Sequence, residues 1–437
     1  MNRFLGVIYL AFGIGLSATA QEKKGVVAFP GAEGFGAYAI GGRGGKVYKV
    51  TNLDDRGPGS FREGCEADGP RTVVFEVAGN IELKSAIRIN NGFLTVAGQT
   101  APGDGVCLKN HPILISAHDV VIRYIRCRPG DVSSEEMDSI SINRNCQDVI
   151  VDHCSASWGS DELISVSGTN IRNITVQWCF ITESMNHSVH HKGDHGYGSL
   201  IRTDGPVTYH HNVYAHNKSR NPRPGSYGDP KATLLDFRNN VIYDWGERAG
   251  YSAEDPTSIN YVGNYLKPGP STKRHGEAFH VGGLATKLFV SGTYMVETNG
   301  VITDDWKLVS NWSVSNKVDK PFPAAAVKTE TAQEAYQRIL RDVGANVPVR
   351  DAVDQRVLRE IAEGTGHIIN SQKDVGGWPE LKPGAAPVDT DGDGIPDAWE
   401  SAHQLNPKDA SDGKAISKGG GYSNLENYLN SLIPGGK

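Results

Sequence analysis

Val149-Ile-Val-Asp-His-Cys154 and Ile174-Thr-Val-Gln-Trp-Cys179 are the stretches that decide the fold of this chain. Each alternates apolar and polar residues, as a half-buried strand does, and each ends on a small polar residue or a cysteine. Similar runs recur between about residue 73 and residue 296, and they predict a repeated strand. The others are Val121–Cys127, Val207–Asn212, Leu235–Asn240, Ile259–Asn264 and Leu288–Thr293.

The spacing of these runs predicts stacked coils. Counted from Cys127, their last residues are 27, 25, 33, 28, 24 and 29 positions apart, which fits one solenoid turn plus a loop of variable length. A sandwich or barrel would instead show hairpin turns about every 8 to 12 residues. We therefore expect an all-β, right-handed parallel β-helix. Residues at the shared last position, among them Asn212 and Asn240, should form an inward stack at a coil corner.

Composition and charge narrow the class of protein. The 437 residues include 38% hydrophobic side chains, enough for a large core, and 52 glycines, which favour turns over long helices. The formal net charge of -6 argues against a nucleic-acid partner. The six cysteines show no C-x-x-C pattern, so buried thiols and disulfides both stay open.

The first twenty residues are typical of a signal peptide. Arg3 precedes the apolar run Phe4–Leu16, and Ala18-Thr19-Ala20 forms an A-x-A cleavage site. The run is short for a membrane span. Export to the periplasm or beyond the cell is expected, with no membrane anchor after cleavage.

Beyond Thr293 the pattern becomes helical. Thr331–Val343 and Ala352–Ala362 both carry a helical apolar period. These helices are expected to pack on the solenoid. The predicted domains are a β-helix over residues 21–300, a partly helical extension over 301–381 and a small module over 388–437.

A calcium loop is predicted in the last module. Oxygen donors fall at positions 1, 3, 5, 9 and 12 of a twelve-residue stretch, with glycine at position 6 and a backbone carbonyl at position 7, which is EF-hand spacing. The loop resembles the calcium repeats of dockerin and thrombospondin type 3 modules, although a second repeat lacks its acids. The expected structural ligands are Asp389, Asp391, Asp393, Ile395, Asp397 and Glu400.

The central coils carry the candidate chemistry. Asp152 lies in one strand run, and Asp161-Glu162 follows it. His210–Arg223 lies on a later coil. Acids on adjacent coils can converge on one face and form an oxygen-rich cation site. The region is also rich in histidine, and a zinc site stays open as an alternative.

The chain resembles polysaccharide lyase family 1, the pectate lyases, and in its calcium loop a bacterial subgroup of them. Ordered motifs between about residues 28 and 295 carry the resemblance. They are Ala32–Gly36, Gly41–Gly45, Val50–Asp55, Gly57–Arg62 and Thr72–Gly79. The resemblance implies a parallel β-helix and calcium-dependent β-elimination of polygalacturonate by a monomer.

The resemblance also assigns roles to residues. Asp152 and Asp161 match calcium ligands, while Ser165 stands where the family has a further acid, so that Glu162 or a loop residue is expected to complete the site. Arg220 matches the base and Arg223 a substrate-binding arginine, whereas Gly225 replaces a third arginine. Lys192 is expected at the substrate carboxylate. An arginine base favours an alkaline optimum, because the arginine pKa is normally above 12.

Two other functions remain open from the sequence. A pectin-directed glycoside hydrolase would need two carboxylates on either side of the scissile bond. Asp161 and Glu162 are adjacent, so that on a strand they would point to opposite faces. The departures at Ser165 and Gly225 also leave a non-catalytic carbohydrate-binding β-helix open.

Overall fold

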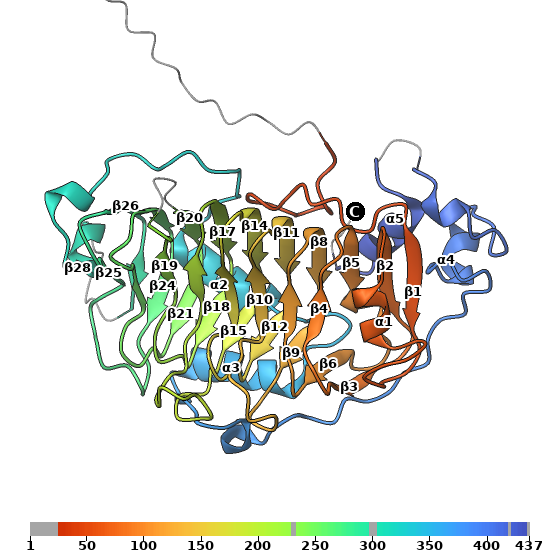
Figure 1. The fold of residues 1–437 in the computed structure, drawn as a ribbon, viewed down its shortest axis with the longest axis horizontal. Helices are drawn as coiled ribbons and strands as arrows, with labels where there is room; N and C mark the ends of the chain where they lie inside the picture. Colours follow the sequence, from red (N-terminus) through yellow and green to blue (C-terminus); the bar gives the residue numbers. More distant parts are fainter. Residues whose placement is uncertain (1–24, 229–232, 297–303, 418–420, 435–437) are drawn as a thin grey trace, which may run out of the picture.

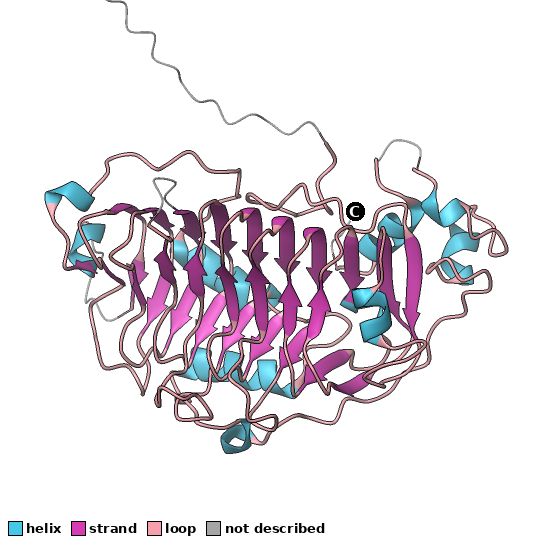
Figure 2. Ribbon diagram, viewed as in Figure 1, coloured by secondary structure: helices cyan, strands magenta, loops and turns pink. Residues whose placement is uncertain are grey.

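The computed structural model describes residues 25–228, 233–296, 304–417 and 421–434. The predicted signal peptide lies outside these residues. Within them, parallel strands stack coil upon coil into one long solenoid (Figure 1), so the predicted parallel β-helix is confirmed. Figure 2 shows that strand dominates, with the helices at the outside of the coils and at one end.

Each coil contributes strands to up to three sheets, joined by turns. The ten-stranded sheet contains β1 (Lys46–Val50), β2 (Arg71–Phe75), β5 (Leu94–Ala97), β8 (His118–Arg123), β11 (Gln147–Asp152), β14 (Arg172–Gln177), β17 (Pro206–His210), β20 (Thr233–Arg238), β23 (Thr257–Val262) and β26 (Thr286–Ser291). The nine-stranded sheet contains β3 (Gly79–Glu82), β6 (Val106–Lys109), β9 (Arg126–Arg128), β12 (Ser155–Ser157), β15 (Phe180–Thr182), β18 (Val213–Ala215), β21 (Val241–Tyr243), β24 (Tyr265–Lys267) and β27 (Tyr294–Met295).

The remaining strands form a six-stranded sheet and a short three-stranded one that follows it along the solenoid. The six-stranded sheet contains β4 (Ile87–Ile89), β7 (Ile113–Ile115), β10 (Ile140–Asn143), β13 (Ile164–Ser167), β16 (Leu200–Arg202) and β19 (Arg223–Gly225). The three-stranded sheet contains β22 (Gly250–Tyr251), β25 (Phe279–His280) and β28 (Val309–Ser310). We call the segments that lead into these two sheets the entry turns.

The described residues also contain five α-helices and five 3-10 turns. The α-helices are α1 (Phe61–Glu66), α2 (Ala332–Asp342), α3 (Ala352–Glu363), α4 (Asp397–Ala402) and α5 (Asn424–Ser431). The 3-10 turns are η1 (Gly98–Thr100), η2 (Asp305–Leu308), η3 (Val314–Asn316), η4 (Gln372–Val375) and η5 (Asp412–Lys414). Helix α2 begins at a capping box formed by Thr331 and Glu334, and α3 ends at Gly364 with φ 76°.

The inside of the solenoid is a continuous apolar core built from inward side chains of every coil. A corner stack runs beside it. The backbone N–H of Asn212 donates to Asn240 Oδ1 at 3.0 Å, and the N–H of Asn240 donates to Asn264 Oδ1 at 2.9 Å. The predicted asparagine ladder is therefore confirmed. All six cysteines are buried free thiols.

Cys127 does not belong to this ladder, which corrects one predicted register. Ala156 pairs with Cys127, so Cys154 stands two residues earlier in its coil, opposite Ile125. Alternation has a period of two residues, so a slip of two leaves the pattern unchanged and the sequence does not reveal it.

Two helices cover the nine-stranded sheet. Ala335 and Ile339 of α2 and Val357 of α3 pack against a shared apolar cluster that includes Phe180 and Val241. Buried ion pairs add to this contact, since Arg128 Nη2 lies 2.7 Å from Asp354 Oδ1 and Arg128 also pairs with Asp351. On the ten-stranded sheet, Leu425 and Leu429 of α5 pack with Val74 and Ala97 of the first coils.

Candidate active site

Three carboxylates meet where two entry turns lie side by side. Asp138 precedes β10, and Asp161 and Glu162 precede β13, the next strand in the same parallel sheet. One oxygen of each lies within 4.8 Å of the others. The Glu162 N–H donates to Asp138 Oδ1 at 3.1 Å, which fixes the two turns together. We call Asp138, Asp161 and Glu162 the acidic cluster.

Burial, and then the repulsion between neighbouring carboxylates, raises the pKa values of two residues of the acidic cluster. Burial raises the pKa of Glu162 well above its usual value, and the neighbouring Asp138 adds to the rise. Burial and then Asp161 also raise the pKa of Asp138. A hard cation relieves such repulsion and prefers carboxylate oxygens, so these three residues fit a calcium-type ion.

Arg220 contacts the acidic cluster from an entry turn two coils away. Its guanidinium pairs with Glu162 and lies 4.0 Å from the ring centroid of Tyr197. The residue has φ 61°, an uncommon backbone conformation for a side chain with a Cβ. Burial opposes its charge, but Glu162 and Tyr251 outweigh that effect and raise the pKa of Arg220.

A histidine pair supports the acidic cluster from the intervening entry turn. His195 Nε2 lies 2.6 Å from Asp161 Oδ1, and this hydrogen bond lowers the pKa of Asp161 although burial opposes it. The rings of His190 and His195 are stacked with centroids 3.7 Å apart and planes 6° apart. A metal–imidazole bond lies in the ring plane, so two stacked rings cannot share one ion well. The pair therefore fits hydrogen bonding to carboxylates better than zinc binding.

Basic side chains continue the row of entry turns beyond Arg220. The Glu247 N–H donates to Lys218 O at 2.6 Å, and the Lys273 N–H donates to Gly246 O at 2.9 Å, which places these turns on successive coils. They line a hollow of about 660 Å³. Its lining residues are Tyr197, Ser219, Glu247, Arg248, Tyr251, Lys273 and Arg274. We call Arg248, Lys273 and Arg274 the basic row.

Asp152, predicted as a calcium ligand, is not in the acidic cluster. It ends β11 in the ten-stranded sheet and is fully buried. Arg123 Nε and His153 Nδ1 lie 2.8 and 2.7 Å from its oxygens, and Gln177 donates at 2.8 Å. Burial opposes its charge, but these partners lower its pKa. The third carboxylate beside Asp161 and Glu162 is that of Asp138, not that of Asp152.

The structure places the other predicted residues as follows. Ser165 is buried and its Oγ accepts the Leu200 N–H at 3.1 Å, outside the acidic cluster. Arg223 is half-buried at the start of β19, three residues after Arg220. Lys192 is exposed, and its N–H donates to His190 Nδ1 at 3.1 Å. Arg220, Asp161 and Glu162 are thus brought together.

The C-terminal loop gathers most of its predicted ligands and one that was missed. Asp389, Asp391 and Asp393 have oxygens within 4.8 Å of one another, as do Asp393, Glu400 and Asp412. Asp397 is outside this group, because its oxygens accept the N–H and hydroxyl of Thr390 at 2.7 and 2.6 Å. Ile395 is buried, and its N–H donates to Asp393 Oδ1.

Comparison with known proteins decides the family. No family model matches the chain. The "probable pectate lyase C" of Emericella nidulans is 38% identical over 437 residues, which cover 97% of each protein. The chain belongs to the pectate lyase family. The protein of the same name from Aspergillus terreus is also 38% identical, over 96% of this chain.

Membership of the family makes this chain a polysaccharide lyase. These relatives are fungal, and they do not support the bacterial subgroup suggested by the calcium loop. Two solved structures share the fold. A Bacillus sp. N165 pectate lyase in complex with trigalacturonate has a TM-score of 0.50 at 16% identity, and a pectate lyase bound to a hexasaccharide has 0.51 at 15%. They cover 72% and 75% of this chain, and 99% of their own. Within the described residues, no helix is both long and apolar enough to cross a membrane.

Proposed function

We propose that this chain cleaves polygalacturonate by β-elimination, with Arg220 as the base and a calcium ion at the acidic cluster. The observation that carries the proposal is the contact between Arg220 and Glu162, which places a basic group and a cation site side by side. The names of the relatives support the substrate class.

The residues of the chain divide the reaction between them. The proton at C5 of a uronate is weakly acidic because it lies next to a carboxylate. Calcium bound by the acidic cluster would supply positive charge that stabilises the developing negative charge on that carboxylate. Arg220 would accept the C5 proton, the C4–C5 double bond would form, and the C4–O4 bond would break, with the leaving oxygen protonated by water.

Arg220 must be neutral to accept a proton, and its surroundings control this. In the structure Glu162 raises the pKa of Arg220, although burial opposes the rise. When a cation also binds Glu162, this carboxylate raises the pKa of Arg220 less. Burial of the guanidinium then favours the neutral form of Arg220. Tyr197 keeps the guanidinium in place through its ring face. An alkaline optimum follows from this proposal.

Substrate carboxylates would lie along the basic row. Arg248 lies on the turn after that of Arg220, and Lys273 and Arg274 share the turn after that, so these charges follow one another along the solenoid axis. A linear polyanion has its charges in the same arrangement, and the basic row offsets the net negative charge of the protein locally. Lys192 and Arg223 are proposed to contact the carboxylate at the cleaved bond. Export by residues 1–20 fits a polymeric substrate outside the cell.

The direct test is incubation with polygalacturonate, with and without a calcium chelator. The proposal predicts near-ultraviolet absorbance from the new C4–C5 double bond, and its loss on chelation. New reducing ends without absorbance would indicate hydrolysis instead, and binding with neither signal would indicate a carbohydrate-binding protein.

A further inference from the structure

We propose that Asp391, Asp393, Glu400 and Asp412, together with Asp389, bind a divalent cation of the calcium class, and that this ion fastens the C-terminal segment onto the first coils of the solenoid. We call these five residues the clasp. This inference does not depend on the proposed reaction, because the clasp is separate from the acidic cluster.

Buried oxygens without partners carry the inference. Glu400 is fully buried, and neither of its carboxylate oxygens has a hydrogen-bond partner. Asp391 Oδ2, Asp393 Oδ2 and Asp412 Oδ1 are in the same state. A buried carboxylate left unpaired is costly, and five such oxygens in one place call for a common partner. A calcium ion takes six to eight oxygens, so these five and water would complete its shell.

The electrostatics of the clasp agree with its geometry. Burial raises the pKa of Glu400 to about 7, and repulsion from Asp393 and the other clasp acids adds to the rise. Burial, again reinforced by neighbouring acids, raises the pKa of Asp393 to about 6. Among the described residues, Lys49 forms an ion pair with the clasp: its Nζ lies 2.8 Å from Asp389 Oδ2.

The backbone already holds part of the clasp in a binding conformation. The N–H groups of Gly392 and Gly394 donate to the two oxygens of Asp389 at 2.8 and 2.9 Å. The two glycines have φ 81° and 92°, a conformation that favours glycine. These hydrogen bonds hold the loop from Asp389 to Asp393 in a tight turn around the Asp389 carboxylate.

Asp412 reaches the loop from a separate turn, and this makes the clasp a cross-link. It begins η5, and its Oδ2 accepts the Asn406 N–H at 2.8 Å, while its Oδ1 is buried without a hydrogen-bond partner. A Cβ built on Gly413 would lie 2.0 Å from Asp393 Oδ2, so only glycine permits this approach. An ion shared by Asp412 and Glu400 would tie η5 to α4.

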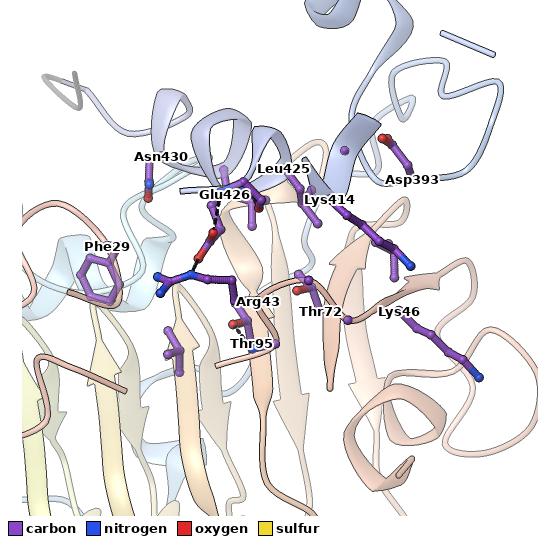
Figure 3. A pocket seen from close by; sticks show the side chains of 18 of the residues that line it. Phe29, Arg43, Lys46, Thr72, Thr95, Asp393, Lys414, Leu425, Glu426 and Asn430 are labelled. Carbon is purple, nitrogen blue, oxygen red and sulfur yellow. Dashed lines mark hydrogen bonds and ion pairs between the residues drawn. The ribbon is translucent and has the colours of Figure 1, made fainter. Parts of the chain in front are cut away.

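The clasp lies directly against the solenoid. Ile395, inside the loop, packs with Leu425 of α5 on Val74 and Ala97 of the ten-stranded sheet. Arg43 Nε and Glu426 Oε1 form an ion pair at 2.8 Å, and both side chains line a cavity of about 260 Å³ together with Asp393 (Figure 3). Figure 1 shows α4 and α5 beside β1. Ordering the loop therefore orders the contact that covers the first coils.

The test compares the full chain with Glu400→Gln in calcium and in chelator. By calorimetric titration with Ca²⁺, the variant should bind one equivalent fewer than the wild type. Calcium should raise the melting temperature of the wild type by about 3 °C or more, and this gain should be lost in the variant. In chelator the variant should melt no lower than the wild type, because one repelling charge has been removed. Lyase activity is not a readout, so failure of the proposed reaction would leave the result unaffected.

Two further variants make the outcome decisive. Asp412→Asn should reproduce the effect of Glu400→Gln, whereas Asp397→Asn, which alters the acid that bonds Thr390, should keep the calcium equivalent. Equal calcium stoichiometry in wild type and both clasp variants would overturn the inference. The inference would also be overturned if Glu400→Gln lowered the melting temperature equally in calcium and in chelator.

Discussion

Arg220 and Glu162 form an ion pair although they lie on entry turns two coils apart. Arg220 lies beside the hollow that contains the basic row, and Glu162 belongs to the acidic cluster. The proposed cation site and the proposed proton acceptor thus both contact one carboxylate, that of Glu162. Any change in the charge of Glu162 should act on both.

Glu162→Gln should therefore weaken calcium binding and activity together. The substitution keeps the shape of the side chain but removes one of three clustered carboxylates. We expect activity on polygalacturonate to fall by about 10-fold to 100-fold. The measurement is initial rate against calcium concentration. Glu254→Gln, an exposed acid, is the control. An unchanged calcium dependence in Glu162→Gln would remove this residue from the cation site.

Asp152→Asn should act on stability instead. Its carboxylate neutralises Arg123 and bonds His153 in a buried position, so removing the charge leaves a cation unpaired. We expect a loss of about 3 kcal/mol in the free energy of unfolding, measured with denaturant. The calcium concentration for half-maximal activity should be unchanged in the folded variant. A large rise in that concentration would return Asp152 to the cation site.

Neutralising the basic row should raise KM more than it lowers kcat. Arg248→Gln combined with Arg274→Gln removes two positive charges from the hollow beside Arg220 but leaves the acidic cluster intact. Affinity for polygalacturonate should fall about 10-fold or more, and added salt should have less effect on it. Lys84→Gln, an exposed lysine on the early coils, is the matched control. Equal KM values for the double variant and the control would place the substrate elsewhere.

His216 should make the stability of the protein fall at alkaline pH. The ring is fully buried between Asp244 and Glu360, at 2.8 and 3.2 Å. Although burial opposes its charge, these acids raise the pKa of His216 from 6.5 to about 9. Because the pKa of His216 is higher in the folded state, the charged ring stabilises the folded protein fully below pH 6.5. This contribution is lost as the pH rises through about 9.

The expected loss is at most about 3 kcal/mol in the free energy of unfolding between pH 6.5 and pH 9.5. Urea unfolding at several pH values measures it, and His216→Gln should flatten the slope. If the variant shows the same slope as the wild type over this range, another group causes it.

The coils could be predicted from the sequence because the strands alternate between apolar and polar residues. In addition, successive coils place a residue of the corner stack directly after the strand. Asn212, Asn240 and Asn264 revealed that stack through their spacing. Cys127, which lies two residues away from the predicted register, is the exception. Alternation fixes which face a residue occupies, but not which of two equivalent positions it holds along the coil.

The acidic cluster was harder to predict, because neighbours in space come from the same turn on successive coils rather than from nearby positions in one coil. Asp152 is close to Asp161 in sequence but lies in another sheet. Asp138 is 23 residues before Asp161, about one coil, and this interval was the available signal. Asp412 was missed for a similar reason, since it lies outside the twelve-residue loop that it completes.

The most direct measurement of the central claim compares Arg220→Lys with the wild type on polygalacturonate at saturating calcium. We predict that near-ultraviolet product absorbance falls at least about 100-fold, because the shorter lysine side chain lacks the planar guanidinium and would not place a nitrogen at the C5 proton, while calorimetric binding of oligogalacturonate is retained. Product absorbance at the wild-type rate in Arg220→Lys would show that Arg220 is not the base.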